Sequence, residues 1–307
     1  RHADAVVTNF AAGVNERLGI SYDILSRINP RIITVSVTGF GETGPARNRP
    51  AFDQVVQGMG GGMSITGQPD GPPTRAGIPI GDLGGGVFAA IGLLSALVER
   101  ERTGMGRHVD VSMLDCQISL LNYMATMTLL SGENPERIGN AHMVHIPYNT
   151  FKTATKYIIV AVIGDTFWPG FVKALDLTEL EDEKYKVHAN RFADRERIER
   201  IIQERLLTNT AEYWLERLRE HRVPCGPVNE FTDALSDEQV LARNMVVPVV
   251  QKDGHPVYMP GNPVKFHPPM EESYQPAPEV GEHTAEVLGE LLGLEGAALE
   301  DLKTEGV

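Results

Sequence analysis

Two acidic residues in the first half of the chain stand where a carboxylate could do chemistry. Asp115 follows Ser112 by three residues and precedes an apolar run, which is the spacing of a capping box at a helix start. The helix dipole stabilises an anion in the first turn, so the same position also suits a nucleophile. Asp115 is therefore interpreted either as a helix-capping residue or as a nucleophile, and Asp110 as a hydrogen-bonding residue of the strand before it.

Other residues with chemical potential are scattered along the chain. Glycine triplets at 60–62 and 84–86 could lie against a phosphate, but neither fits the dinucleotide or P-loop spacing. His142 and His145 have no further histidine or cysteine nearby, so we expect a pocket-lining loop and no metal site. Guanidinium groups clamp phosphates and carboxylates, and each of four arginines is either such a clamp or a solvated surface residue. They are Arg17, Arg47, Arg49 and Arg75.

The composition is that of an acidic globular protein. Its 307 residues carry 28 Lys and Arg against 41 Asp and Glu, a net charge of −13, and 42% apolar residues suffice for a sizeable core. The densest cationic stretch, residues 191–205, is interleaved with acidic residues, which argues against a nucleic-acid partner. No apolar run reaches the about 18 residues of a membrane span and no leader is visible, so neither membrane insertion nor export is expected.

The cysteines and the first residues add two expectations. Cys116 and Cys225 lie far apart and form neither a disulfide framework nor a zinc ligand set, which fits a reducing cytoplasm. The chain begins at Arg1 and leads at once into a strand-like run, so we expect it to be part of a longer protein.

The order of apolar runs predicts an α/β protein. Short β-branched runs alternate with helical stretches near the N-terminus, which indicates a parallel sheet with crossover helices. The expected elements there are strands at 5–8, 32–37 and 108–112, one helix at 15–29, and two long apolar helices at 86–102 and 113–130 that form the core. Residues 58–86 are rich in glycine and proline and are expected to be irregular.

After residue 132 the composition changes to a mixture typical of a smaller α+β domain. A rigid connector with two prolines is expected at 223–228. The remaining expected elements are a strand at 153–163, helices at 167–175, 191–204 and 210–221, strands at 246–251 and 258–263, and a terminal helix at 284–292.

Several short motifs occur in the order found in one family. They include TNF at 8–10, ERLG at 16–19, GFG at 39–41, GRHVDVSMLD at 106–115, PCGPV at 224–228 and GEHT at 281–284. On these motifs the chain resembles the class III coenzyme A transferases, the CaiB/BaiF family, over nearly its whole length.

The resemblance implies a Rossmann-like large domain, a smaller α+β domain and an interlocked homodimer. The large domain would be built from N- and C-terminal parts. The implied boundaries are 1–131 for its coenzyme A-binding N-terminal part, 132–152 for a linker, 153–228 for the small domain, and 229–307 for a linker and the return to the large domain. Family members begin some tens of residues earlier, which agrees with an incomplete chain.

The resemblance also assigns residues to roles. Asp115 matches the nucleophilic aspartate and Asp53 an acidic residue beside it, whereas Arg75 is a candidate clamp for an acceptor carboxylate. The implied coenzyme A contacts are Asn9, Phe10, Arg17 and Leu18. The implied active-site loop contains Gly139, Asn140 and His142. Oxalate-using members carry a glycine run at this loop, and the sequence HMVH at 142–145 argues against that specificity.

The implied activity is transfer of coenzyme A from an acyl-CoA to a carboxylic acid through an aspartyl-CoA thioester. The substrates would be small acids such as succinate, with coenzyme A as substrate and no permanently bound cofactor. An α-methylacyl-CoA racemase is an alternative, but its histidine base is replaced here by Phe52. A non-catalytic acyl-CoA-binding protein is the other alternative.

Overall fold

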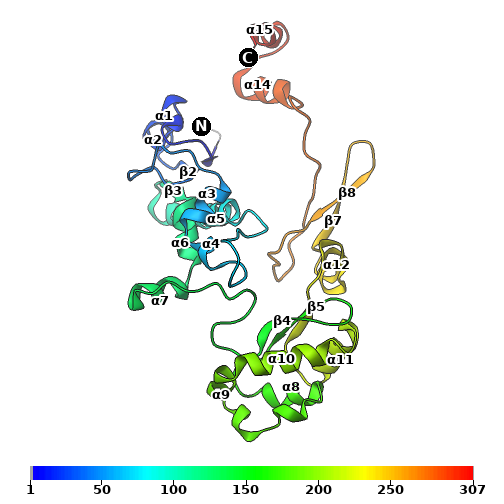
Figure 1. Ribbon diagram of the computed structural model, residues 1–307. Helices are drawn as coiled ribbons and strands as arrows, with labels where there is room; N and C mark the ends of the chain where they lie inside the picture. Colours follow the sequence, from blue (N-terminus) through cyan, green and yellow to red (C-terminus); the bar gives the residue numbers. More distant parts are fainter. Residues whose placement is uncertain (1–2, 307) are drawn as a thin grey trace. The chain divides into compact units, whose positions relative to one another are not determined.

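The structure, a computed structural model, describes residues 3–306. The chain falls into two compact units, one up to Pro227 and one from Val228 onward (Figure 1). The first unit contains every residue to which the sequence assigns a chemical role.

A parallel sheet forms the N-terminal part of the first unit. Its strands are β1 (Ala5–Thr8), β2 (Ile33–Thr38) and β3 (His108–Ser112), in the order β1-β2-β3. This confirms the predicted strands and their parallel pairing. One face of the sheet is apolar and packs Ile33 and Val35 against helix α5 (Ile80–Thr103). The opposite face is polar, because alternate residues of each strand point the other way.

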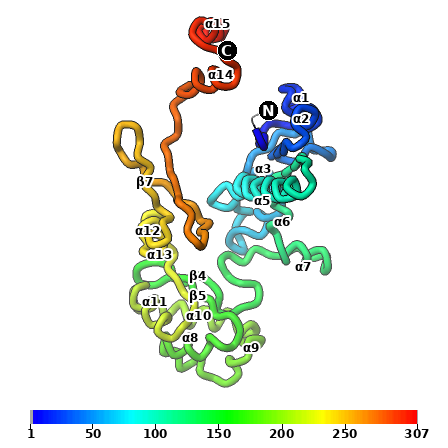
Figure 2. Tube along the Cα trace, turned by 180° about the vertical axis from the view of Figure 1, so that it is seen from behind, coloured from blue at the N-terminus to red at the C-terminus, as the bar shows by residue number. Residues whose placement is uncertain are grey.

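The predicted helices of this part are broken where single residues take a left-handed backbone. The helix expected at 15–29 is two short helices, α1 (Val14–Arg17) and α2 (Tyr22–Ile28), because Gly19 has a φ of +73° between them. The helix expected at 113–130 is also two, α6 (Met113–Leu120) and α7 (Tyr123–Ser131), separated by Asn122 with a φ of +54°. Figure 2 shows the chain running from α6 through α7 before it enters the next part. None of the residues of α7 is buried, so the expected core role of this stretch belongs to α6 alone.

The region expected to be irregular, 58–86, is partly helical. It contains the end of α3 (Asp53–Met59), all of α4 (Gly62–Ile65) and the first turns of α5. Helix α5 starts six residues before the predicted position, and Gly84 and Gly85 lie buried in its first turns. A Cβ on Gly85 would lie 3.2 Å from side-chain atoms of Met113 and Val37, so the glycine lets α5 approach the sheet.

Helix α5 is the one helix among the described residues that bears on the expectation of no membrane span. By length and apolar composition it could cross a membrane, whereas the sequence predicts no such segment. The core helices of many water-soluble proteins have the same length and composition. Here Ala89 and Ala96 of α5 pack on the apolar face of the sheet.

Gly106 fixes the entry of the chain into β3. Its N–H donates to the Pro30 carbonyl at 2.8 Å, and its own carbonyl accepts from the Tyr22 hydroxyl at 2.8 Å. A Cβ at this position would lie 1.7 Å from the Ile32 carbonyl oxygen. The backbones therefore touch, and the start of β3 is held against the start of β2.

The second part of this unit is an α+β arrangement, as predicted. Strands β4 (Tyr148–Lys152), β5 (Tyr157–Ala161) and β6 (Cys225–Pro227) form an antiparallel sheet. Strand β4 lies in the range that the sequence assigns to a linker, so that range is not entirely irregular. The helices are α8 (Trp168–Ala174), α9 (His188–Ala193), α10 (Arg195–Leu206) and α11 (Ala211–Glu220), with 3-10 turns at η1 (Thr178–Leu180) and η2 (Glu183–Lys186).

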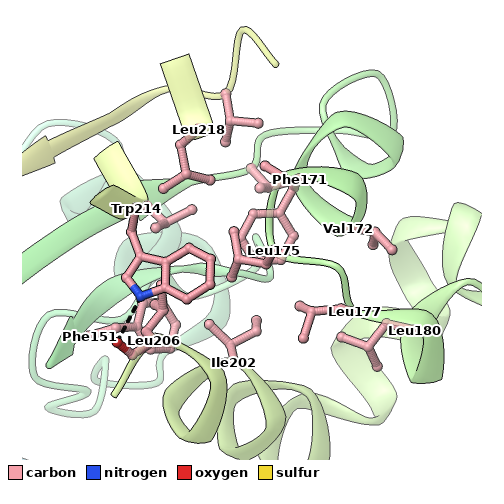
Figure 3. Packing of buried hydrophobic residues seen from close by; sticks show 14 of the residues in the cluster. Phe151, Phe171, Val172, Leu175, Leu177, Leu180, Ile202, Leu206, Trp214 and Leu218 are labelled. Atoms are coloured by element: carbon pink, nitrogen blue, oxygen red, sulfur yellow. Dashed lines mark hydrogen bonds between the residues drawn. The ribbon is translucent and has the colours of Figure 1, made fainter. Parts of the chain in front are cut away.

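An extended apolar core holds this α+β part together. Figure 3 shows Phe171 of α8, Leu175 directly after α8, and Trp214 and Leu218 of α11 in this core. The Trp214 indole N–H donates to the Leu206 carbonyl at 2.9 Å, so its polar atom is satisfied inside the core.

The second unit is smaller and has a two-stranded antiparallel sheet. Strands β7 (Val246–Val250) and β8 (Pro256–Pro260) confirm the predicted strands, and α14 (Thr284–Leu292) confirms the predicted helix. Three further helices were not predicted: α12 (Phe231–Ser236), α13 (Glu238–Ala242) and α15 (Ala297–Glu305).

Candidate functional site

Asp115 lies in the first turn of α6, and its side chain is free. The Ser112 hydroxyl accepts a hydrogen bond from the Asp115 N–H at 3.1 Å, which confirms the predicted cap. The residue is exposed, and its carboxylate has no hydrogen bond or ion pair with any residue between 3 and 306. A carboxylate without partners at the positive end of a helix is available to attack an electrophile.

The neighbouring thiol does not compete for this role. Cys116 is buried, and burial raises the pKa of its thiol, with the charge of Asp115 raising it further. The thiol therefore stays protonated, and a thiol is a much weaker nucleophile than a thiolate.

A loop of residues 39–42 supports the first turn of α6. The Gly39 carbonyl accepts a hydrogen bond from the Leu114 N–H at 3.1 Å. The Gly41 N–H donates to the Thr38 hydroxyl at 2.8 Å. A Cβ on Gly39 would lie 2.3 Å from the Ala51 Cβ, so the loop is also pressed against the segment leading to α3. The backbone beside Asp115 is thus fixed from two sides.

Asp53, the second predicted catalytic carboxylate, is fully engaged in hydrogen bonds. One oxygen accepts from the backbone N–H groups of Gly81 at 2.8 Å and Asp82 at 3.4 Å, and the other accepts from Gln57 Nε2 at 2.7 Å. These bonds tie the start of α3 to the start of α5. Unlike Asp115, Asp53 has its oxygens committed to structure.

Two buried glutamines, which the sequence does not predict, connect α3 to the segment before α5 and α6 to the start of α5. Gln57 accepts a hydrogen bond from the Ala76 N–H at 3.0 Å through its side-chain oxygen. Gln117 donates to the Ile80 carbonyl at 3.2 Å. A Cβ on Gly60 would lie 2.5 Å from the Gln117 Cβ, so α3 and α6 touch at a glycine. Neither helix is otherwise apolar, so the sequence does not single out these glutamines.

Of the four predicted coenzyme A contacts, two directly follow β1 and two lie at the end of α1. Asn9 donates from its side chain to the Val37 carbonyl at 2.7 Å, which joins the ends of β1 and β2. Phe10 and Leu18 expose 46% and 57% of their surface, and Arg17 is exposed with no partner among residues 3–306. Open α/β sheets bind ligands at the carboxyl ends of their strands, so this position suits a ligand.

The predicted active-site loop borders a cavity of ≈ 410 Å³. Its lining includes Gly139, Asn140 and His142 with Gln68 and Tyr123. The Gly139 N–H donates to the Gly67 carbonyl at 3.0 Å, and Asn140 donates from its side chain to the Thr150 hydroxyl at 2.9 Å. Asp115 and Asp53 are not among the residues that line this cavity.

The surroundings of His142 favour its neutral form. Its Nδ1 accepts hydrogen bonds from the N–H groups of Val144 at 3.0 Å and His145 at 3.1 Å. Burial lowers the pKa of His142, and the nearby charges of His145, Arg195 and His188 lower it further. The predicted pocket-lining histidine is therefore a neutral imidazole. Among residues 3–306 no cluster of histidine, cysteine and acidic side chains has a metal-binding arrangement.

Arg75, the predicted carboxylate clamp, lies elsewhere. Its guanidinium donates to the carbonyl of the next residue, Ala76, at 3.3 Å, and the side chain is exposed. It does not line the cavity beside Gly139.

Comparison with known proteins gives one consistent result. The model of CoA-transferase family III matches residues 1–284. The chain is 39% identical over 268 residues to the acetyl-CoA:oxalate CoA-transferase of Acetobacter aceti, covering 87% of this chain and 68% of that relative. It is 34% identical to the succinate–glutarate CoA-transferase of Agrobacterium fabrum, covering 97% of this chain and 75% of that relative.

The fold agrees with this result. A CAIB/BAIF family protein from Brucella suis has a similar crystal structure, with a TM-score of 0.83 and 34% identity over 94% of this chain and 75% of that one. The mixed α/β fold with its parallel sheet, the motifs and the relatives all point the same way. The chain belongs to CoA-transferase family III, the CaiB/BaiF family of class III coenzyme A transferases.

Proposed function

We propose that the protein transfers coenzyme A from an acyl-CoA to a small carboxylic acid, with Asp115 as the nucleophile. The observation that carries the proposal is the exposed, partner-free carboxylate of Asp115 on a capped helix start. A structural carboxylate would have its oxygens engaged, as those of Asp53 are.

The reaction would conserve the thioester bond energy on the enzyme. The Asp115 carboxylate attacks the donor thioester carbonyl, and the C–S bond breaks to give a mixed anhydride and the coenzyme A thiolate. The thiolate then attacks the aspartyl carbonyl, which releases the donor acid and leaves an aspartyl-CoA thioester. The acceptor carboxylate repeats the two steps in reverse, forms its own CoA thioester and restores Asp115.

The surroundings of Asp115 favour this chemistry through geometry. The N–H groups of Leu114 and Asp115 already donate to Gly39 and Ser112, so the first turn is rigid before substrate binds. A rigid nucleophile loses less conformational freedom on reaching the reacting carbonyl. Asp53 contributes by holding the start of α5.

The proposed coenzyme A contacts are Asn9, Phe10, Arg17 and Leu18. Arg17 offers a free guanidinium for a phosphate, and the exposed Phe10 and Leu18 offer apolar surface for the adenine ring or the pantetheine arm. The loop with Gly139, Asn140 and His142 is proposed to exclude water from the anhydride. No permanently bound cofactor is required by this mechanism.

For the acids, we propose small dicarboxylates with a succinyl donor, and Arg75 as a clamp for the second carboxylate. Relatives are named for succinate and glutarate and also for oxalate. The sequence HMVH at 142–145 argues against oxalate. Because the relative from Acetobacter aceti is named for oxalate, oxalyl-CoA is still included among the acyl-CoAs to be tested. We place the enzyme in the cytoplasm as an interlocked homodimer whose large domain combines N- and C-terminal parts, as the family resemblance implies.

The test is mass spectrometry of the protein after brief incubation with succinyl-, acetyl-, glutaryl- and oxalyl-CoA. A coenzyme A adduct on the peptide that contains Asp115 is expected, and the acyl-CoA that loads fastest identifies the donor. Asp115→Asn is the matched control and should carry no adduct. Exchange of the substrate α-proton with deuterated water without an adduct would replace transferase by racemase. If neither an adduct nor α-proton exchange is detected, the protein would be a non-catalytic acyl-CoA-binding protein.

A further inference from the structure

The polar face of β3 contacts the loop of residues 39–42 as well as capping α6. His108, Asp110 and Ser112 alternate along the strand and therefore share one face. They pair in register with Thr34, Ser36 and Thr38 of β2, whose side chains are also polar. The three β2 residues and Ser112 are buried, whereas His108 is half-buried and Asp110 is exposed, so the outer part of this face is open to contacts with a loop.

The Asp110 side chain binds the backbone of the loop of residues 39–42. Its Oδ2 accepts a hydrogen bond from the Glu42 N–H at 3.0 Å. Gly41 has a φ of +83°, and an added Cβ there would be in ordinary van der Waals contact with the Ser112 Cβ at 3.5 Å and Asp110 Oδ2 at 3.6 Å. The loop thus lies directly against the strand end that leads to Asp115.

His108 holds the same loop by a side chain. Its Nε2 lies 2.8 Å from Glu42 Oε2, and its Nδ1 lies 2.7 Å from the Thr34 hydroxyl. Thr34 is buried, so the imidazole is anchored on the sheet at one nitrogen and engages the loop at the other. Glu42 is therefore fixed at both its backbone and its side chain.

The other end of the loop contacts the helix of the nucleophile. The Gly39 carbonyl accepts from the Leu114 N–H, one residue before Asp115. A shift of the loop would move this carbonyl and with it the first turn of α6. The polar face of β3 is therefore connected to Asp115 in two ways. Ser112 bonds the Asp115 N–H directly, and Asp110 supports the loop that bonds the preceding residue.

We propose that Asp110 and the Glu42–His108 pair are positioning residues for Asp115. They touch neither substrate nor reacting atoms; they hold residues 39–42 so that the first turn of α6 presents the carboxylate in one orientation. A displacement of about 1 Å in a catalytic group can lower a rate about 100-fold, so such support has kinetic weight. This inference rests on the proposed function of Asp115.

The test compares Asp110→Ala with Asp110→Asn and Glu42→Ala with His108→Ala. We expect Asp110→Ala to lower kcat and the rate of Asp115 adduct formation about 10-fold or more, with KM for the acyl-CoA within about 2-fold. Asp110→Asn should restore most of the rate, because its amide oxygen can still accept from the Glu42 N–H. Glu99→Ala, which removes a surface ion pair between Glu99 and Arg107, is the control and should leave both constants unchanged.

A double-mutant cycle tests the pair. Glu42→Ala and His108→Ala should lower kcat by similar factors, and the double variant by no more than the larger of them, because each change breaks the same contact. Where Asp110→Ala does not unfold cooperatively, Glu42→Ala decides, since it removes only a side chain that lies partly at the surface.

Three results would overturn the inference. They are an unchanged adduct rate in Asp110→Ala and Glu42→Ala, a loss confined to KM, and a failure of Asp110→Asn to restore the rate in a folded protein. Absence of an adduct in the unchanged protein would instead remove the proposed function, and this inference with it.

Discussion

The Asp53 carboxylate caps the start of helix α5, because its Oδ1 accepts a hydrogen bond from the Gly81 N–H at 2.8 Å. Asp53 precedes Gly81 by 28 positions in the chain. The other oxygen takes the Gln57 side chain at 2.7 Å. Capping from a distance joins two helices that sequence proximity alone would not hold together.

Removing this cap should destabilise the fold. We expect Asp53→Ala to lower the free energy of unfolding by about 1–2 kcal/mol, since N–H groups at the helix start lose their acceptor. Asp53→Asn should lose less, because one oxygen remains. Urea unfolding followed by circular dichroism measures both, with exposed Asp70→Ala as the control. Equal stability of Asp53→Ala and Asp70→Ala would contradict the capping role.

Asp115 and Ser112 should separate activity from stability. Asp115→Asn is expected to change the free energy of unfolding by less than about 0.5 kcal/mol, because its side chain is exposed and has no partner. The same change should lower kcat about 1000-fold or more if the residue is the nucleophile. Ser112→Ala should cost about 1 kcal/mol through the lost cap. Turnover and urea unfolding on the same samples check the pair, and near-normal turnover of Asp115→Asn would contradict the mechanism.

Two glycines two residues apart should respond in opposite directions. In Gly60→Ala the new Cβ would lie 2.5 Å from the Gln117 Cβ and 2.9 Å from the Val56 carbonyl oxygen. We expect a loss of about 1–3 kcal/mol from overpacking between α3 and α6. In Gly62→Ala the Cβ meets nothing within 4 Å and lies in helix α4, so a gain of up to about 1 kcal/mol is expected. Melting temperatures of both variants test this. Equal changes in melting temperature would contradict the close contact between Gly60 and Gln117.

Stability should fall as the pH drops below about 6.5, the ordinary pKa of histidine. The folded-state pKa values of His142 and His188 are lowered, chiefly by burial. Between those lowered values and 6.5 the unfolded chain binds more protons than the folded one, so acid favours unfolding. Glu199 acts in the opposite direction above about pH 4.5, because burial raises the pKa of its carboxyl group and the folded state keeps its proton.

Melting temperatures between pH 5 and 8 measure this dependence. The double variant His142→Gln with His188→Gln should flatten the curve below pH 6.5 while the Glu199 contribution persists. A curve that keeps its slope in the double variant would assign the pH dependence to other groups.

Arg191 should be irreplaceable by lysine. It is completely buried, and its guanidinium donates to the carbonyls of Ile146 at 3.1 Å, Tyr185 at 2.7 Å and Gly164 at 2.6 Å. A lysine ammonium cannot span these acceptors, so Arg191→Lys is expected to cost about 3 kcal/mol or more. Exposed Arg200→Lys on α10 is the control and should be neutral. Urea unfolding distinguishes the two, and a neutral Arg191→Lys would show that the acceptors find water instead.

The sequence predicts much of the sheet but not the breaks in the helices. The β-branched runs at β1, β2 and β3 are sufficient because strand periodicity is local. The break at Asn122 depends on one residue with a φ of +54°, which an apolar run does not reveal. Strand β4 was missed because its sequence, YNTFK, alternates weakly and follows a stretch rich in turn signals.

The candidate site divides in the same way. The Ser112 cap of Asp115 is visible in the sequence because its partners are three residues apart. Asp53, Gln57 and Gln117 form hydrogen bonds with partners 19 to 37 residues away in the chain, which only the packed helices bring together. Local spacing therefore predicts the capped helix start at Asp115, whereas tertiary packing determines which contacts support it.

The close approach at Gly106 has a consequence for any saturation-mutagenesis screen of this enzyme. Every other residue would place a Cβ within 1.7 Å of the Ile32 carbonyl oxygen, so all nineteen replacements should disappear even under selection for soluble expression alone. Gly106 lies in the same short motif as Asp115, nine positions before it. Intolerance at Gly106 would therefore mark a steric limit, and only positions that lose turnover while keeping expression would mark the chemistry.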